Sequence, residues 1–96
     1  MALRSEFGHY NNITSATTTV VKTGPGSLYA VIVNSTVANG TITIYDNTAG
    51  SGTLIATVTY PATLLASQTV LPYFTQFTTG LTVVTTGVAN ITVIYQ

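Results

Sequence analysis

The chain has 96 residues, no cysteine and a net charge of zero, and only 4% of its residues are charged, namely Arg4, Glu6, Lys22 and Asp46. Disulfides are therefore excluded, and two basic side chains cannot neutralise a phosphate backbone, so no nucleic-acid partner is expected. The longest clear apolar run, residues 29–33, is far shorter than the roughly 20 residues of a membrane helix. Residues 1–10 lack the apolar core of a signal peptide. We expect one soluble domain with no membrane partner.

Residues 1–14 differ in composition from the rest of the chain. They hold three of the five ionisable residues, Arg4, Glu6 and His9, and show neither helical nor strand periodicity. The segment predicts an N-terminal arm that is mobile alone and is ordered by a partner, or a frayed end with no role. Residues 15–96 then form the folded domain.

From Ser15 onward the sequence is typical of β-strands. Threonine, valine, isoleucine and tyrosine dominate, and glycine, proline and asparagine interrupt them every 8–12 residues or so. The predicted strands are 15–22, 27–34, 41–46, 53–60, 68–77, 80–86 and 90–96. The strand 68–77 is expected to bend or split at Pro72, and residues 62–67 are a candidate for one helical turn. This spacing favours an all-β sandwich or barrel.

The alternation of apolar residues predicts which faces are buried. Ile42 and Ile44 share one face of their strand, as do Ile91, Val93 and Tyr95. In 53–60 the pattern places Leu54, Ala56, Val58 and Tyr60 together, opposite Ile55, Thr57 and Thr59. In 27–34 it places Leu28, Ala30 and Ile32 opposite Tyr29, Val31 and Val33, so both faces are apolar. That strand is either central and covered on both sides, or its outer face contacts another chain.

The surface positions carry threonine where lysine or glutamate is usual. Soluble monomers protect their sheet edges with charges, especially lysine. Here the edges have only Pro61, Pro72, short strands and glycine turns. A nearly uncharged surface also resists association poorly. We therefore expect edges that pair with neighbouring copies and a homo-oligomer or larger assembly.

The residues needed for catalysis or metal binding are scarce. His9 is the only histidine, and the two carboxylates, Glu6 and Asp46, lie far apart in the chain. No hydrolytic triad, zinc cluster or phosphate-binding loop can be assembled from the sequence. We expect no enzymatic activity, no cofactor and no metal.

Tyrosines leave carbohydrate binding as a weaker possibility. The sequence has six tyrosines but no tryptophan, and Tyr73, Phe74 and Phe77 gather near Pro72. This cluster favours a core or subunit contact over a platform for a sugar ring.

The loop 46–52, with sequence DNTAGSG, joins two strands of matching alternation. Asp46 and Asn47 favour Asx-type turns, and Gly50 and Gly52 permit positive φ, so a hairpin is predicted. Calcium requires 6–8 oxygen ligands, often from several carboxylates, and one aspartate is a poor set. A cation would need three copies of Asp46 gathered on the axis of a trimer.

Three motifs resemble small structural proteins of tailed bacteriophages: KTGPG at 22–26, ITIYDNTAGSGTLIA at 42–56 and TTGLTVVTTG at 78–87. The resemblance covers Thr18 to Tyr95. It implies a single antiparallel β-sandwich, jelly-roll-like or immunoglobulin-like, of about seven or eight strands. It also implies a capsid cement or decoration protein, often a trimer, that clamps subunits of the major capsid protein. Such a protein is made in the host cytoplasm and resides on the capsid surface of the virion.

The function that these observations favour is therefore stabilisation of a capsid by a symmetric homo-oligomer. The alternative is a receptor-binding or fibre-tip domain that recognises a host glycan, although the chain has no repeating stalk segment. The candidate partner contacts are Arg4, Glu6, Phe7, His9 and Tyr10 in the arm, and Tyr29, Val31 and Val33 on the strand with two apolar faces.

Overall fold

The computed structural model describes residues 8–35, 39–60, 69–87 and 90–96, and for Thr69 the backbone alone. Within these residues the chain is all-β. It forms eight strands, which are β1 (His9–Ile13), β2 (Thr18–Thr23), β3 (Gly26–Ser35), β4 (Thr41–Asp46), β5 (Thr53–Thr59), β6 (Thr69–Phe77), β7 (Gly80–Thr86) and β8 (Asn90–Tyr95). The seven predicted strands are present with shifts of at most a few residues at their ends. The helical turn predicted at 62–67 lies outside the described residues, which contain no helix able to cross a membrane.

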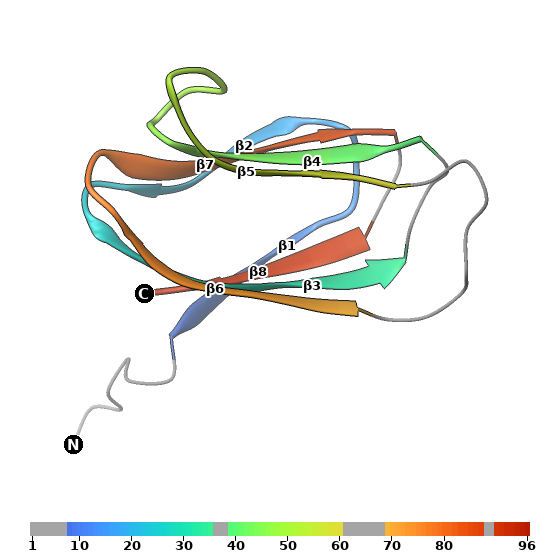
Figure 1. The fold of residues 1–96 in the computed structure, drawn as a ribbon, viewed down its shortest axis with the longest axis horizontal. Helices are drawn as coiled ribbons and strands as arrows, with labels where there is room; N and C mark the ends of the chain where they lie inside the picture. The colour runs from blue at the N-terminus through green and yellow to red at the C-terminus, as the bar shows by residue number, and fades with distance from the viewer. Residues whose placement is uncertain (1–7, 36–38, 61–68, 88–89) are drawn as a thin grey trace.

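The strands form two four-stranded antiparallel sheets packed face to face (Figure 1). Sheet A has the order β1-β8-β3-β6, and sheet B has the order β2-β7-β4-β5. The pairs β1–β8, β2–β7, β3–β6 and β4–β5 show one long hairpin with its turn between β4 and β5. This hairpin folds over so that β3 also pairs with β8, and β4 with β7. The arrangement is the jelly roll, one of the two sandwich forms expected.

The core lies between the sheets and follows the predicted alternation in the central strands. Ile42 and Ile44 of β4 and Ile91 and Val93 of β8 are all buried. Burying an aliphatic side chain of this size contributes about 1.5–3 kcal/mol. The rest of the core comes from Ile13, Val21, Leu28, Val31, Val33, Tyr60, Phe77, Leu81 and Val83. In strands with one clear apolar face, the sequence pattern therefore determines which face is buried between the sheets.

The segment predicted as a mobile arm begins the sandwich instead. His9–Ile13 forms β1, and each of its five residues pairs with a residue of β8. Ile13 is buried in the core. The prediction of an arm over 1–14 is wrong for these residues because β8, some 80 residues away, supplies pairing that no local pattern signals. Residues 1–7 lie outside the described part of the chain.

Bulges change the face assignment in two strands. In β3 the register shifts between Leu28 and Ala30, so Leu28, Val31 and Val33 are buried together. In β5 an extra residue opposite the step from Ile44 to Tyr45 leaves Leu54 exposed, although it was predicted to share a face with Ala56. An odd insertion reverses the alternation on one side of it.

The β4–β5 loop folds back over the outer face of sheet B (Figure 1). The Thr82 hydroxyl on β7 donates a 2.7 Å hydrogen bond to the Asn47 carbonyl, and Thr82 is fully buried. A Cβ atom at Gly50 would lie only 2.8 Å from Cγ2 of Val84, so glycine permits this close approach. Part of sheet B is thus covered by the chain's own loop.

Candidate interaction surface

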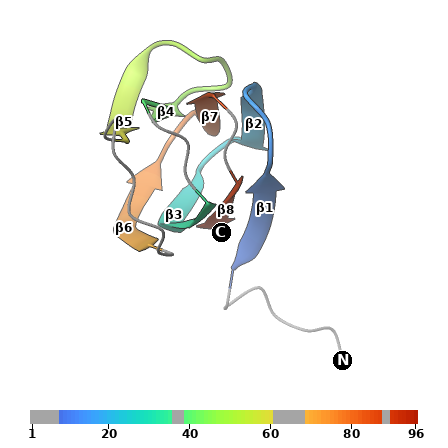
Figure 2. The same ribbon diagram turned by 90° about the vertical axis from the view of Figure 1, so that its right-hand side faces the viewer.

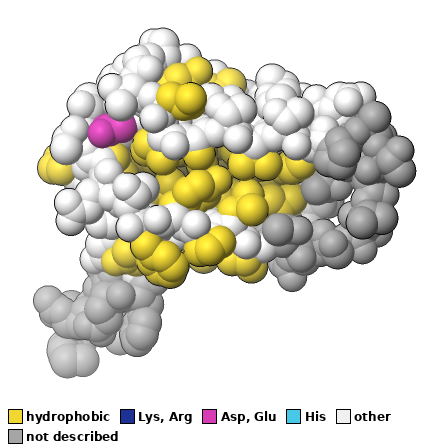
Figure 3. Space-filling model, in the orientation of Figure 1, with side chains coloured by type: hydrophobic (Ala, Val, Ile, Leu, Met, Phe, Trp, Pro, Cys, Tyr) yellow, Lys and Arg dark blue, Asp and Glu magenta, His cyan; other side chains and the backbone are white. Residues whose placement is uncertain are grey.

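Two rows of side chains cross the outer face of sheet A from edge to edge. The first row is Tyr10, Ile94, Ala30 and Pro72, and the second is Asn12, Thr92, Ile32 and Val70. With Tyr29 and Phe74, the apolar members form the surface that we call the apolar face: Tyr10, Tyr29, Ala30, Ile32, Val70, Pro72, Phe74 and Ile94. None of them is charged. Figure 3 shows apolar side chains along the lower margin, where Figure 1 places sheet A.

Three side chains of the apolar face are strongly exposed. Tyr10 is 74% exposed, Val70 57% and Phe74 78%. Isolated exposed apolar residues are normal on proteins, but contiguous patches mark interaction sites. Three such side chains on one uncharged sheet face make this face the candidate interaction surface.

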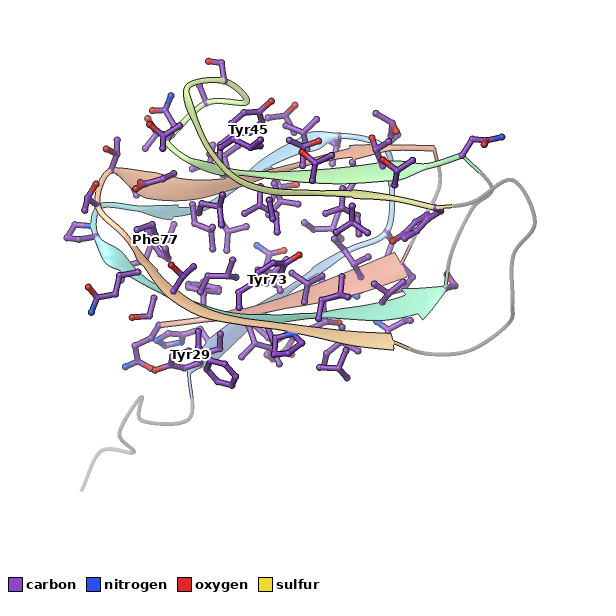
Figure 4. All side chains as sticks on the ribbon, viewed as in Figure 1. Tyr29, Tyr45, Tyr73 and Phe77 are labelled. Atoms are coloured by element: carbon purple, nitrogen blue, oxygen red, sulfur yellow. The ribbon has the colours of Figure 1, made fainter. Side chains whose placement is uncertain are left out.

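Phe74 is held in an unusual backbone conformation. Its φ is +48°, in the left-handed region that bulky residues rarely adopt. Its ring lies 6.5 Å from that of Tyr29, between centroids, and Figure 4 shows Tyr29 on the outer side of sheet A. Such a conformation costs on the order of 1 kcal/mol or more. Since most of the ring faces solvent, packing within the chain offsets little of this cost, as is common at functional positions.

The structure places the described contact residues in three environments, which are the outer face of sheet A, the start of β1 and the core. Tyr10 and Tyr29 both lie on the outer face of sheet A, within the apolar face. His9 is exposed at the start of β1, with its ring 5.7 Å from that of Tyr95. Arg4, Glu6 and Phe7 lie outside the described residues.

Val31 and Val33 are not contact residues. Their exposed fractions are 0% and 2%, because the bulge in β3 turns them into the core. The outer positions of β3 are instead Ala30 and Ile32, which simple alternation had placed on the opposite face from Tyr29. The strand is central in its sheet and its outer face is apolar, whereas contact of that face with another chain stays a prediction.

Sequence reasoning missed most of the apolar face. The sequence does not distinguish Ile32, Val70 and Ile94 from other strand residues. It also does not show which aromatic residues near Pro72 face inward and which face outward. The structure divides them: Phe77 is buried, Tyr73 packs against the core, and Phe74 points outward. Burial also raises the pKa of Tyr73. The segments 27–34, 68–77 and 90–96 lack charge, but so do 53–60 and 80–86 of sheet B, so the absence of charge does not by itself identify this face.

The carboxylate of Asp46 binds the β6–β7 turn. Its Oδ1 accepts a 2.8 Å hydrogen bond from the Thr79 N–H and a 3.4 Å bond from the Gly80 N–H. The Thr78 N–H donates to Oδ2 at 3.0 Å, and the Thr78 hydroxyl donates at 3.3 Å. The predicted hairpin between β4 and β5 is confirmed by their antiparallel pairing. Asp46 thus ties this hairpin to the next turn in space.

Asp46 should make the stability of the protein depend on acid pH. Hydrogen bonds from backbone N–H groups, the largest contribution coming from Thr79 and the next from Thr78, hold the pKa of Asp46 below its ordinary value of 3.8. A depressed pKa in the folded state gives stabilisation that is complete above pH 3.8 and is lost as pH falls through the lower folded value. We expect Asp46→Asn to lower the melting temperature at neutral pH and to show a smaller further loss on acidification.

Thermal melts of both proteins between neutral pH and about pH 2 measure this difference. Parallel curves for the wild type and Asp46→Asn would contradict the assignment. Glu6 is present in both proteins, so its contribution cancels in the comparison.

No group of three or more His, Cys, Asp or Glu side chains that could hold a metal occurs within the described ranges. Comparisons of the chain with protein-family models, with curated proteins and with solved structures give no match. The apolar face of sheet A is therefore the candidate site on which a functional proposal can be built.

Proposed function

We propose that this protein is a capsid decoration protein of a tailed bacteriophage. It binds the major capsid protein on the outside of the virion as a symmetric oligomer and stabilises the shell. The apolar face carries this proposal, because it is an uncharged surface exposed on a protein with few ionisable groups. The jelly roll is compatible with the proposal, since it occurs in capsid domains, but it also occurs in lectins and cupins. The proposal assigns no catalytic activity and no cofactor.

Binding would depend on a few aromatic and aliphatic side chains of the apolar face. Specific interfaces usually bury about 800 Å² per partner, and a handful of central residues carry most of the binding energy. Phe74 and Tyr10 are the most exposed large side chains of the face. Arg4, Glu6 and Phe7 precede β1 and are proposed as additional contacts, of which Arg4 and Glu6 can supply charge-assisted hydrogen bonds to the shell.

Substitutions on the two sheets provide a matched test. Val70→Ser and Phe74→Ser, on the apolar face, are expected to weaken binding to shells that lack the protein by at least about tenfold. Leu54→Ser is the control, because Leu54 is 54% exposed against 57% for Val70 but lies on β5 of sheet B. Surface changes of this kind alter folding stability by about 0.5 kcal/mol or less, so all three variants should remain folded.

Binding is measured by co-sedimentation with the shells, and stabilisation by the melting temperature of the shell. A wild-type protein that neither binds nor raises that temperature would refute the decoration proposal. Equal losses for Val70→Ser and Leu54→Ser would show that the apolar face is not the contact.

A receptor-binding domain that recognises a host glycan is the second candidate. The exposed rings of Tyr10 and Phe74 lie on one face, and aromatic rings are suited to stacking against sugar rings. A glycan array with the free protein distinguishes the two functions. A specific signal that Phe74→Ser abolishes, together with no shell binding, would favour receptor recognition.

A further inference from the structure

The edges of the two sheets differ in how they are protected from pairing. Among the described strands, β1 and β6 are the edges of sheet A, and β2 and β5 are those of sheet B. Figure 2 shows β1 and β2 on one side of the sandwich and β5 and β6 on the other. An edge strand presents backbone N–H and C=O groups that can pair with another chain, and proteins block such pairing with bulges, prolines or charges.

Three of these edges carry a blocking feature. In β2 the register shifts between Val20 and Lys22, and Lys22 adds a charge. In β5 an irregularity lies opposite the step from Ile44 to Tyr45. In β6 the register shifts between Thr75 and Pro72, where proline also lacks an N–H.

The fourth edge, β1, has none of these features. Its five residues pair with β8 in an unbroken register from His9 with Tyr95 to Ile13 with Ile91. The strand HYNNI contains no proline and no Asp, Glu, Lys or Arg. Among the described residues, the shortness of β1 is the only protection of this edge. It also carries Tyr10, whose ring is 74% exposed.

We propose that β1 pairs with β1 of a second copy of this chain, antiparallel, about a two-fold axis at Asn11. In this register Asn11 lies opposite the partner's Asn11, and Tyr10 lies opposite the partner's Asn12. It is the one register that pairs all five residues of both strands. A shift by one residue would place outward residues opposite inward ones, which a continuous sheet does not permit.

The composition of β1 fits its own copy. Amides both donate and accept hydrogen bonds, so Asn11 can pair with itself, and no like charges face each other. The two Tyr10 residues become diagonal neighbours whose backbones are about 7–8 Å apart, a separation that aromatic side chains can span. The two sheets A join into one eight-stranded sheet, and the apolar faces become one continuous surface. The two-fold axis makes a dimer, in place of the trimer implied by the resemblance to phage proteins.

Two double variants test the register as well as the interface. Tyr10→Lys with Asn12→Lys places lysine opposite lysine twice across the axis, whereas Tyr10→Lys with Asn12→Glu places lysine opposite glutamate twice. Both variants lose the ring of Tyr10 and the side-chain amide of Asn12. The hydrogen bonds of that amide to Asn90 and Ile91 lie within the chain, so both variants lose them equally. They differ in charge pairing across the axis and in the net charge of the chain.

Sedimentation equilibrium of the free protein measures the outcome. We expect a wild-type dimer, a dissociation constant about tenfold or more weaker for the lysine–lysine variant than for the lysine–glutamate variant, and a difference that shrinks at high salt. A monomeric or trimeric wild type would overturn the proposal. So would two variants with equal dissociation constants.

Hydrogen exchange gives a second measurement that needs no substitution. Amides of β1 that face away from β8 should become protected as the wild-type concentration rises through the dissociation constant, while those of edge strand β5 should not. Protection of β1 that is independent of concentration would overturn the proposal. Neither experiment uses shells, so failure here leaves the proposed capsid function standing, and failure of shell binding leaves the dimer standing.

Discussion

Phe77→Ala is expected to remove a large part of the stability of the protein. Phe77 is 1% exposed and lies between the sheets at the end of β6 (Figure 4). Truncating a buried phenylalanine to alanine costs about 3–5 kcal/mol, through lost burial and the cavity left behind. A domain of this size usually has a total stability of about 5–14 kcal/mol. The variant should therefore unfold at a much lower urea concentration than the wild type.

Phe74→Ala is the matched control for this prediction. It removes the same side chain three residues earlier in the same strand, but Phe74 is 78% exposed. Its free energy of unfolding should change by about 0.5 kcal/mol or less. Urea denaturation followed by circular dichroism measures both variants. Similar midpoints for the two would show that β6 does not place Phe77 inward and Phe74 outward.

Gly26→Ala is expected to have the second largest effect. A Cβ atom at Gly26 would clash with the carbonyl oxygen of Gln96 and lie 2.8 Å from Cζ of Phe77. The Gln96 carbonyl accepts a 3.1 Å hydrogen bond from the Ser27 N–H, and the Gln96 N–H donates to the Ser27 carbonyl at 2.8 Å. Because the obstacle is backbone, the end of β8 must move away. Overpacking of this kind costs about 1–3 kcal/mol and sometimes more.

Gly24→Ala separates this clash from the general cost of replacing a glycine. Gly24 has a φ of +94°, but a Cβ atom there would meet nothing within 4 Å. In Gly24→Ala only backbone strain lowers the free energy of unfolding, and the hydrogen bonds between Ser27 and Gln96 should be kept. Amide exchange of these two residues is the measurement. Retained protection in Gly26→Ala would mean that β3 and β8 do not approach as closely as the structure places them.

Asp46 illustrates how a conspicuous residue acquired its role from distant parts of the chain. The sequence predicted a turn, because one carboxylate beside asparagine and glycine is a poor set of ligands for a cation. The structure adds that the carboxylate binds the backbone N–H groups of Thr78, Thr79 and Gly80, more than 30 residues away. Local turn propensity was visible from the sequence, but these hydrogen-bond partners were not, because only the packing of two turns at one end of the sandwich brings them together.

The proposed dimer and the apolar face would act together. Pairing of β1 with its copy would place two apolar faces side by side on one sheet, so a single partner could contact both. Two linked sites bind more tightly than one when the geometry lets both engage. The dimer would therefore bind the capsid shell more tightly than a monomer would through the same uncharged contacts.

The sequence by itself determined the fold class and the central core. In strands 41–46 and 90–96 isoleucine or valine recurs at every second position, so burying that face decides the orientation of Ile42, Ile44, Ile91 and Val93. The glycine, proline and asparagine residues between strands were sufficient to predict the positions of seven of the eight strands found in the described residues. Local chemistry was sufficient there because each strand carried its own apolar stripe.

The tertiary structure alone decided the eighth strand, the bulges and the candidate surface. β1 has no apolar period, and it is a strand only because β8 pairs with it. The bulge in β3 arises from its pairing with β6 and β8, and it moved Val31 and Val33 from the predicted surface into the core. A one-residue shift in register reverses a strand's faces, and register is set by neighbouring strands that are distant in sequence.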